Sequence, residues 1–261
     1  MFRRIAAVFL SVVLLAAGAG VLTGNQVNAA SSMRVIVNGQ ELQPGVGSAY
    51  TSGSSVMLPL LDTAEALKYR VTFTGATGTF LLERFQESVQ FRLSGQELLL
   101  DGKDKVTYTD GFELKQKRAY APLSFFSAIG LVTSYNAATG QVELYTPEVT
   151  ASAVAGLLAS GNYQALRDRY YAKETEALSQ PVLQQSWEGM SAPAGNFLGV
   201  KSTESKHQDG NITIVSVLAF AKGEAVLTLT LNDSGKLTNL TLAPVPAKEV
   251  SASPVQTQAA P

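Results

Sequence analysis

The chain has no cysteine and only one histidine among its 261 residues. The lack of cysteine excludes disulfides, thiolate zinc sites, iron–sulfur clusters, a cysteine nucleophile and a lipidated amino-terminal cysteine. One histidine cannot build a copper or zinc site that needs several imidazole ligands. The sequence therefore predicts no metal site and no cofactor.

The chain also lacks a surplus of positive charge, with 20 Lys and Arg against 21 Asp and Glu. Without the arginines at the amino terminus, which belong to an export signal, 18 basic residues face 21 acidic ones, a net charge of about −3. A near-neutral chain without a basic block has no electrostatic footprint for nucleic acid, so we expect no nucleic-acid partner. At about 100–150 residues per domain, the length suggests two domains.

Residues 1–29 have the pattern of a secretory signal. Two arginines precede the almost wholly apolar run Ile5–Leu22, and small residues then lead to a predicted cleavage between Ala29 and Ala30. The alternative is an uncleaved membrane anchor, because the apolar run is nearly long enough to span a bilayer. No second stretch approaches ~18 consecutive apolar residues. We therefore expect a secreted, extracellular protein with no membrane span after signal removal.

The opposite end, residues 244–261, is made of Pro, Ala, Ser, Val, Gln and Thr with one Lys and one Glu. Such a segment buries too little apolar surface to offset the entropy lost on ordering. We expect this tail to be disordered.

An internal repeat organises the first half. The segments Met57–Leu60 and Tyr120–Leu123 each place a proline before a short helical run, a strand and an Ala-Thr-Gly turn, and Pro59 aligns with Pro122 at an offset of 63 residues. Proline pre-sets φ for a first helical turn, and glycine supplies the positive φ of a tight hairpin. Because neither unit could bury its apolar face alone, we expect the two copies to share one core. Between them, Ser88–Thr109 alternates apolar and polar residues, as strands do.

Arg34–Gln40 adds a strand with an Asn-Gly hairpin signal. With the two proline-containing segments, it resembles the copper amine oxidase-like N-terminal, or stalk, domain over residues 33–146. The resemblance implies a twisted antiparallel sheet packed on helices and a non-catalytic module, common in exported envelope proteins of spore-forming Firmicutes such as Paenibacillus. In that family, copper and the quinone cofactor belong to a separate catalytic domain. We therefore expect no amine oxidase activity.

The second half begins with helical patterns and ends with alternating ones. We expect helices over 150–160 and 163–173 and from Pro181 onward, with capping residues and a proline at their starts. Four strands should follow, each separated by a Gly-containing turn, over the ranges 196–204, 212–221, 225–231 and 237–242. Helices followed by an antiparallel meander predict an α+β domain, and an α+β fold class for the chain.

This half, residues 150–243, resembles a domain family of unknown function in exported bacterial proteins, of cystatin/NTF2-like type. The resemblance rests on Leu157, Gly161 and Tyr163, on Leu183 and Trp187, and on Gly195 and Phe197, followed by the strands. It implies helices lying across a curved sheet, an arrangement that can leave a cone-shaped pocket. The family has no agreed catalytic residues, so the resemblance supplies none.

No catalytic constellation is apparent in the sequence. A Gly-x-Ser-x-Gly elbow and a Ser-x-x-Lys motif are both lacking. A serine triad would need His207, which we place in a polar hairpin turn, in contact with solvent. The carboxylate pairs Glu83 with Glu87 and Glu174 with Glu176 lie in hydrophilic stretches and read as solvated charge.

Aromatic residues offer the remaining candidates for binding, because rings stack on apolar faces and tyrosine keeps a polar hydroxyl. Their helical spacing favours core packing as the competing interpretation. Adjacent Phe125 and Phe126 suggest that one of these rings faces outward. The candidate ligand-binding or partner-binding residues of the second half are Tyr163, Tyr170, Tyr171, Trp187 and Phe197.

The sequence thus favours a secreted, cell-envelope-associated, non-catalytic binding or scaffold protein whose partner is a cell-wall polymer or an envelope protein. The alternative is a secreted hydrolase-related or accessory protein that uses a pocket in the second domain. Whether residues 150–243 enclose a cavity distinguishes these hypotheses most directly. The sequence gives no prediction of the oligomeric state.

Overall fold

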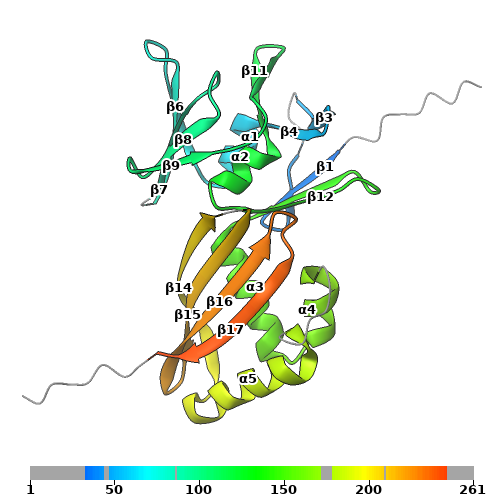
Figure 1. The fold of residues 1–261 in the computed structure, drawn as a ribbon, viewed down its shortest axis with the longest axis vertical. Coiled ribbons are helices and arrows are strands. Elements are labelled where there is room, and N and C mark those ends of the chain that lie inside the picture. Colours follow the sequence, from blue (N-terminus) through cyan, green and yellow to red (C-terminus); the bar gives the residue numbers. More distant parts are fainter. Residues whose placement is uncertain (1–32, 44–46, 86, 172–177, 209, 246–261) are drawn as a thin grey trace, which may run out of the picture. The chain divides into compact units, whose positions relative to one another are not determined.

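The computed structural model describes residues 33–43, 47–85, 87–171, 178–208 and 210–245. The predicted signal over 1–29 and all but the first two residues of the predicted tail lie outside these ranges. Within them, no helix is both long and apolar enough to cross a membrane. The predicted α+β class is confirmed: a strand-rich first domain is followed by three helices and a four-stranded antiparallel sheet (Figure 1).

The first domain contains thirteen strands and two short helices within the described residues. Its strands form three sheets, with the orders β12-β13-β1-β2, β10-β11-β4-β3 and β5-β6-β7-β8-β9, where the resemblance implied one sheet. In chain order the elements are β1 (Arg34–Val37), β2 (Gln40–Glu41), β3 (Tyr50–Ser52), β4 (Ser55–Pro59), α1 (Leu60–Ala66), β5 (Arg70–Thr74), β6 (Thr79–Arg84), β7 (Glu87–Arg92), β8 (Glu97–Leu100), β9 (Asp104–Thr107), β10 (Glu113–Lys115), β11 (Arg118–Pro122), α2 (Leu123–Ala128), β12 (Val132–Asn136) and β13 (Gln141–Tyr145).

The first and last strands of this domain pair with each other. β1 runs parallel to β13, from Arg34 opposite Gln141 to Val37 opposite Leu144. The predicted Asn-Gly hairpin joins β1 to β2, and both of its residues have positive φ, 50° at Asn38 and 82° at Gly39, as a type I′ turn requires. The pairing of β1 with β13 brings the Asn38 turn to the end of β13, where the second domain begins.

The two repeat copies meet through their equivalent strands. β4 pairs antiparallel with β11, placing Leu58 opposite Ala121 and Met57 opposite Pro122. Each strand ends at its repeat proline, which has φ near −65° and directly precedes a short helix. Because the copies pair at corresponding positions, their helices bury residues in a single hydrophobic cluster, as the repeat predicted.

Phe125 and Phe126 on α2 are both fully buried, so the expectation that one faces outward is wrong. Phe125 packs against Phe91 and Phe112 at ring-centroid distances of 4.8 and 5.0 Å. α2 contacts β4, β11 and β12, so adjacent side chains on this short helix both meet protein rather than water.

The second domain places three helices on one face of its sheet (Figure 1). Its elements are α3 (Pro147–Ala159), α4 (Tyr163–Tyr170), α5 (Gln180–Ala194), β14 (Phe197–Gln208), β15 (Asn211–Phe220), β16 (Gly223–Asn232) and β17 (Leu237–Pro244). The core between the helices and the sheet is mostly aliphatic, with Val154, Leu158, Leu166, Leu227 and Leu229 almost completely buried.

β14 is four residues longer at its carboxyl end than the sequence predicted. Its carboxyl-terminal residues are polar and do not alternate with apolar ones as the sequence analysis expected of a strand. They nevertheless pair in continuous register with β15, down to Gln208 opposite Asn211. An edge strand needs burial on one face only, so a polar sequence can continue the ladder. His207 therefore lies on a strand, not in the predicted solvated turn.

The two domains follow one another without a linker. Tyr145 ends β13, Pro147 begins α3, and the buried Thr146 between them caps the helix by accepting a hydrogen bond from the Val149 amide. The Thr146 amide donates to the Asn38 side-chain oxygen at 2.9 Å. Val132 of β12 packs in the core cluster of the second domain. We call this region of contact between the two domains the seam.

Gly235, in the turn between β16 and β17, also lies at the seam. Its φ is +68°, and a Cβ atom at this position would stand 2.9 Å from the Thr133 carbonyl oxygen and 3.2 Å from the Val132 side chain. A side chain here would meet both backbone strain and a close neighbour, so the turn needs glycine to approach β12.

Gly235→Ala should destabilise the protein more than Gly102→Ala does. Gly102 has nearly the same φ, +67°, but a Cβ atom there would have no neighbour within 4 Å. Gly102→Ala should therefore cost only the backbone strain, about 1–2 kcal/mol of unfolding free energy, and Gly235→Ala about 1–3 kcal/mol more from the forced displacement. Urea unfolding of both variants measures the difference. Equal losses would mean that the β16–β17 turn does not approach β12.

Candidate binding site at the seam

A groove of about 450 Å³ opens at the seam and is lined by residues of both domains. We call it the seam groove. The first domain contributes turns, α2 and β12, and the second contributes the end of β14 and the turn after β16. Its lining includes Ser54, Asp110, Ser124, Tyr135, His207 and Asp233. Its volume lies within the range of about 300–1,000 Å³ that is usual for small-molecule sites.

His207 reaches the groove because of the register of β14. It stands opposite Ile212, which is almost completely buried, and the side chains of directly paired residues share a face of the sheet. Its side chain is 19% exposed, so it keeps only partial contact with solvent. The Nε2 atom is buried without a hydrogen-bond partner, and the nearest Asp233 carboxylate oxygen is 3.9 Å away, too far for a hydrogen bond.

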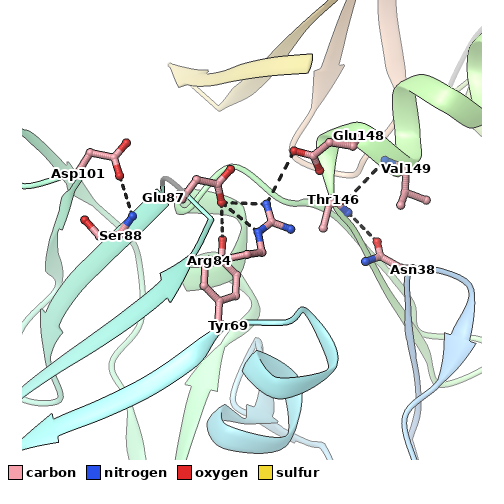
Figure 2. A network of polar contacts seen from close by, with 9 residues as sticks. All are labelled: Asn38, Tyr69, Arg84, Glu87, Ser88, Asp101, Thr146, Glu148 and Val149. Carbon is pink, nitrogen blue, oxygen red and sulfur yellow. Dashed lines mark hydrogen bonds and ion pairs between the residues drawn. The ribbon is translucent and has the colours of Figure 1, made fainter. Parts of the chain in front are cut away.

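A polar network lies at the seam, where Tyr69 and Glu87 line a second cavity (Figure 2). The Arg84 guanidinium donates to the Glu87 carboxylate at 2.8 Å, and the Tyr69 hydroxyl donates to the same carboxylate at 3.1 Å. Arg84 also faces Glu148 in the first turn of α3, at 3.9 Å. Because Arg84 lies on β6 and Glu148 on α3, this ion pair crosses the seam.

Burial and charge shift the proton equilibria in this network. Burial raises the pKa of the Tyr69 phenol, and the Glu87 carboxylate raises it further. Burial alone would lower the pKa of the Arg84 guanidinium, but the oxygens of Tyr69 and Glu87 outweigh that effect and raise it. Arg84 is only 9% exposed and therefore holds a fixed positive charge among acceptors. The network stabilises the seam, and its groups are engaged with one another rather than with a ligand.

Two further cavities share residues with the seam groove. One, of about 360 Å³, is lined in part by Glu87, Asp101, Lys206 and His207. The other, of about 560 Å³, is lined in part by Tyr135, Glu143, Arg169 and Lys236. His207 lines both the seam groove and the first of these cavities, and Tyr135 lines both the seam groove and the second.

Arg169 and Lys236 are already partnered in the third cavity. The Arg169 guanidinium lies over the Tyr145 ring, 5.1 Å from its centroid. The Lys236 ammonium donates to the Arg169 carbonyl oxygen at 2.6 Å. These contacts join the β16–β17 turn to α4 and β13.

The aromatic residues proposed from sequence lie elsewhere, in the hydrophobic cluster of the second domain. Tyr170 and Trp187 are buried, and Tyr163, Tyr171 and Phe197 pack at the edge of the cluster. The Trp187 ring is 5.5 Å from the Phe197 ring and 5.7 Å from the Phe220 ring. Binding by these residues stays a prediction. In the structure, their rings pack against other side chains of the cluster.

The second domain has a small cavity among its helices. A cavity lined by Tyr163, Arg167, Tyr171, Leu178 and Gln180 has a volume of about 10 Å³, close to the space that one water molecule needs. The helices and sheet instead fill their shared interior with aliphatic and aromatic side chains.

Of the carboxylate pairs that the sequence analysis interprets as solvated charge, one lies within the described residues. Glu87 is bound to Arg84, and Glu83 projects from β6 opposite Ser88 of β7. Glu174 and Glu176 lie outside the described residues. Within the described ranges, no group of three or more His, Asp or Glu side chains could hold a metal ion.

Sequence reasoning missed the seam groove because it treated each domain separately. The groove combines side chains up to 179 positions apart, from Ser54 to Asp233, and only the packing of the domains brings them together. Two sequence features belong to this region: the single histidine, which lines the groove, and the glycine of the Asp-Ser-Gly turn, which lies at the seam.

Each half of the chain matches the model of a known protein family. Residues 36–144 match the family model described as copper amine oxidase N-terminal domain. Residues 151–240 match the family model described as protein of unknown function (DUF3887). The chain therefore carries these two domains in that order, as the sequence predicted. A search of curated proteins found no match.

Arg84→Ala should destabilise the protein much more than Arg34→Ala. Both arginines pair with a glutamate at 2.8–2.9 Å, but the Arg34 side chain is 54% exposed. Arg34→Ala should change the unfolding free energy by less than about 1 kcal/mol. Arg84→Ala removes a buried network charge and its packing on Tyr69, and should cost about 1–3 kcal/mol. Denaturant unfolding compares the two, and similar losses would contradict the network's role.

The protein should lose stability as the pH rises above about 10, the ordinary pKa of tyrosine. Burial raises the pKa of Tyr108 to about 12, so between these values the unfolded chain releases a proton that the folded chain keeps. Tyr108→Phe should lower stability at pH 8 by about 1 kcal/mol, because its hydroxyl donates to the Gly95 carbonyl oxygen. Above pH 10 the variant should lose stability less steeply, by up to about 1.4 kcal/mol per pH unit. Parallel curves for the two proteins would contradict the assignment.

Proposed function

We propose that this is a secreted, cell-envelope-associated, non-catalytic binding and scaffold protein whose partner is a cell-wall polymer or an envelope protein. The copper amine oxidase N-terminal domain is a non-catalytic stalk module, and the chain's second domain belongs to a family of unknown function. Amine oxidase activity is not expected of this pair of domains.

The observation that carries the proposal is the seam groove itself. It is open, lies between two domains that pack directly on each other, and is lined by hydroxyl, carboxylate, imidazole and aromatic groups. Because the domains pack directly on each other, the two sides of the groove hold their positions without a ligand. This lowers the conformational entropy that a ligand would have to offset on binding. A stalk with a pre-formed surface groove suits attachment to an extended partner.

Catalysis would need more than the groove offers. A nucleophile needs a base within hydrogen-bonding distance, oriented by a third group. In the described part of the chain, the single imidazole has no partner at Nε2, and its nearest carboxylate is beyond hydrogen-bonding distance. The hydrolase alternative relied on a pocket in the second domain, and the small cavity near Tyr163 gives it no support.

Cell fractionation tests the proposal. We expect the full chain to leave the cytoplasm and to sediment with purified cell walls or envelope fractions. A variant lacking residues 1–29 is the matched control and should remain inside the cell. The proposal fails if the full chain stays cytoplasmic, if it shows no association with walls or envelope proteins, or if it turns over ester, peptide or glycan substrates.

A further inference from the structure

We propose that the cavity of about 560 Å³ beside Arg169 binds a phosphodiester group of a polyol phosphate polymer, held by the Arg169 guanidinium and the Lys236 ammonium. We call this cavity the Arg169 cavity. The inference rests on the proposed binding function and assigns it a site and a class of ligand. His207 takes no part, because it lines the seam groove and not this cavity.

The charges of the lining provide the first argument. Among the described residues that line the Arg169 cavity, Arg169 and Lys236 are positive and Glu143 is negative. In the part of the chain that the structure describes, neither positive group forms an ion pair with an acid. Acids outnumber bases in the whole chain, 21 to 20, but two positive groups face one carboxylate here. A concave surface with excess positive charge attracts anions.

Neutral partners hold the Arg169 guanidinium in place. It lies over the rings of Tyr145 and Tyr170, 5.1 and 5.5 Å from their centroids. Burial and the Glu143 carboxylate raise the pKa of the Tyr145 phenol, and Arg169 lowers it by less. The phenol is therefore neutral near pH 7 and does not cancel the charge of the arginine.

Lys236 is held beside Arg169 by the bond to its carbonyl oxygen, at 2.6 Å. That bond uses one of the three N–H donors of the ammonium. Arg169 is exposed and Lys236 partly exposed, so a ligand can reach both side chains from solvent. The two cations therefore stand together at an accessible place with donors to spare.

Uncharged donors complete the lining. The Asn136 side-chain oxygen accepts hydrogen bonds from two backbone amides of its own turn, at 3.0 and 3.3 Å, which leaves its NH₂ group as a donor. Ser134 and Ser234 add hydroxyl groups. The Glu143 carboxylate already accepts a hydrogen bond from Gln141 at 2.7 Å. The cavity thus offers several donors, which suits a ligand whose charged oxygens only accept.

The placement of these donors favours phosphate over carboxylate. They come from β12, from the end of α4 and from the turn between β16 and β17. The oxygens of a phosphate group point in tetrahedral directions and can meet donors on several sides, while the two oxygens of a carboxylate lie in one plane. Arginine binds phosphate through a planar fork and lysine binds it as a point charge, so the pair suits this group.

The size of the cavity favours a phosphate that is part of a longer chain. A volume of about 560 Å³ is within the range of sites for drug-sized ligands and exceeds what one phosphate group fills. The polyol between two phosphates carries hydroxyl and ether oxygens, which can pair with the remaining polar side chains of the lining. A polyol phosphate polymer therefore matches both the charge and the extent of the cavity.

Calorimetry of the full chain with a tetramer of glycerol phosphate tests the inference. We expect saturable binding at low salt, with a dissociation constant of about 1 mM or below. Binding should weaken in about 0.5 M NaCl, because salt screens the attraction between accessible charges. The inference fails if the tetramer does not bind, or if salt leaves its affinity unchanged.

Variants test the two cations. Arg169→Gln and Lys236→Gln should each weaken tetramer binding by about tenfold. Arg92→Gln and Lys222→Gln are the matched controls, because both residues are exposed and lie outside the Arg169 cavity. The controls should bind within about twofold of the unchanged chain. Equal losses in all four variants would show unspecific attraction to positive charge and would overturn the site.

Glu143→Gln provides a test with the opposite sign. It removes the carboxylate that faces the ligand and keeps a side chain that can still pair with Gln141. Tetramer binding should therefore become about twofold to fivefold tighter. A variant that only disturbed the structure would bind more weakly, so weaker or unchanged binding would contradict the argument from charge. Urea unfolding establishes that this variant and the two cation variants are folded.

Three competing probes decide the class of ligand. Inorganic phosphate stands for the free ion, a glutamate tetrapeptide for a carboxylate-bearing partner, and the N-acetylglucosamine tetrasaccharide for a neutral glycan. The glycerol phosphate tetramer should bind more tightly than each of them. Tighter binding of any one of these probes would overturn the assignment of a polyol phosphate polymer and would name the class that replaces it.

The outcome also separates this inference from the proposed function. If Arg169→Gln and Lys236→Gln sediment with cell walls as the unchanged chain does, the cavity is not the wall contact, although envelope association stands. If the unchanged chain does not associate with the envelope but binds the tetramer through Arg169, the site stands and the proposed location is wrong.

Discussion

The direct junction between the two domains is the constraint on which the rest of the structure depends. One buried residue, Thr146, separates the last strand of the first domain from the first helix of the second. Its amide is bonded to Asn38 and its hydroxyl oxygen caps α3. An exposed linker would leave these groups to water and would allow the domains to separate. The short junction instead places two surfaces against each other and creates the seam groove.

The fold was largely predictable because its local signals agree with its packing. The Asn-Gly turn, the repeat prolines and the hairpin glycines each have a backbone conformation that those residues favour, and each appears where the sequence placed it. The end of β14 was not predicted because pairing with β15 stabilises it. The polar residues near His207 show no alternating apolar pattern that would indicate a strand. The division into three sheets and the parallel pairing of β1 with β13 depend on long-range contacts. The spacing of apolar residues along the sequence does not predict such contacts.

The candidate site was not predictable in the same way. Sequence reasoning named rings such as Trp187 because rings stack on apolar faces, with core packing as the competing interpretation, and Trp187 is buried in the core. Tyr135 and His207 are 72 positions apart and belong to different domains. Their proximity follows from the seam, where Gly235 approaches β12 and Arg84 faces Glu148. A site made by two domains has no local motif.

The central claim is that the two domains are packed together at Thr146 in the free protein. Residue-resolved amide hydrogen exchange tests it most directly, because the Thr146 amide is bonded across the junction to a side chain on the β1–β2 turn. The account predicts that this amide exchanges as slowly as the amides of β13, with an opening free energy close to that of global unfolding. Fast exchange at Thr146 beside slow exchange in β13 and α3 would show a loose linker and would contradict it.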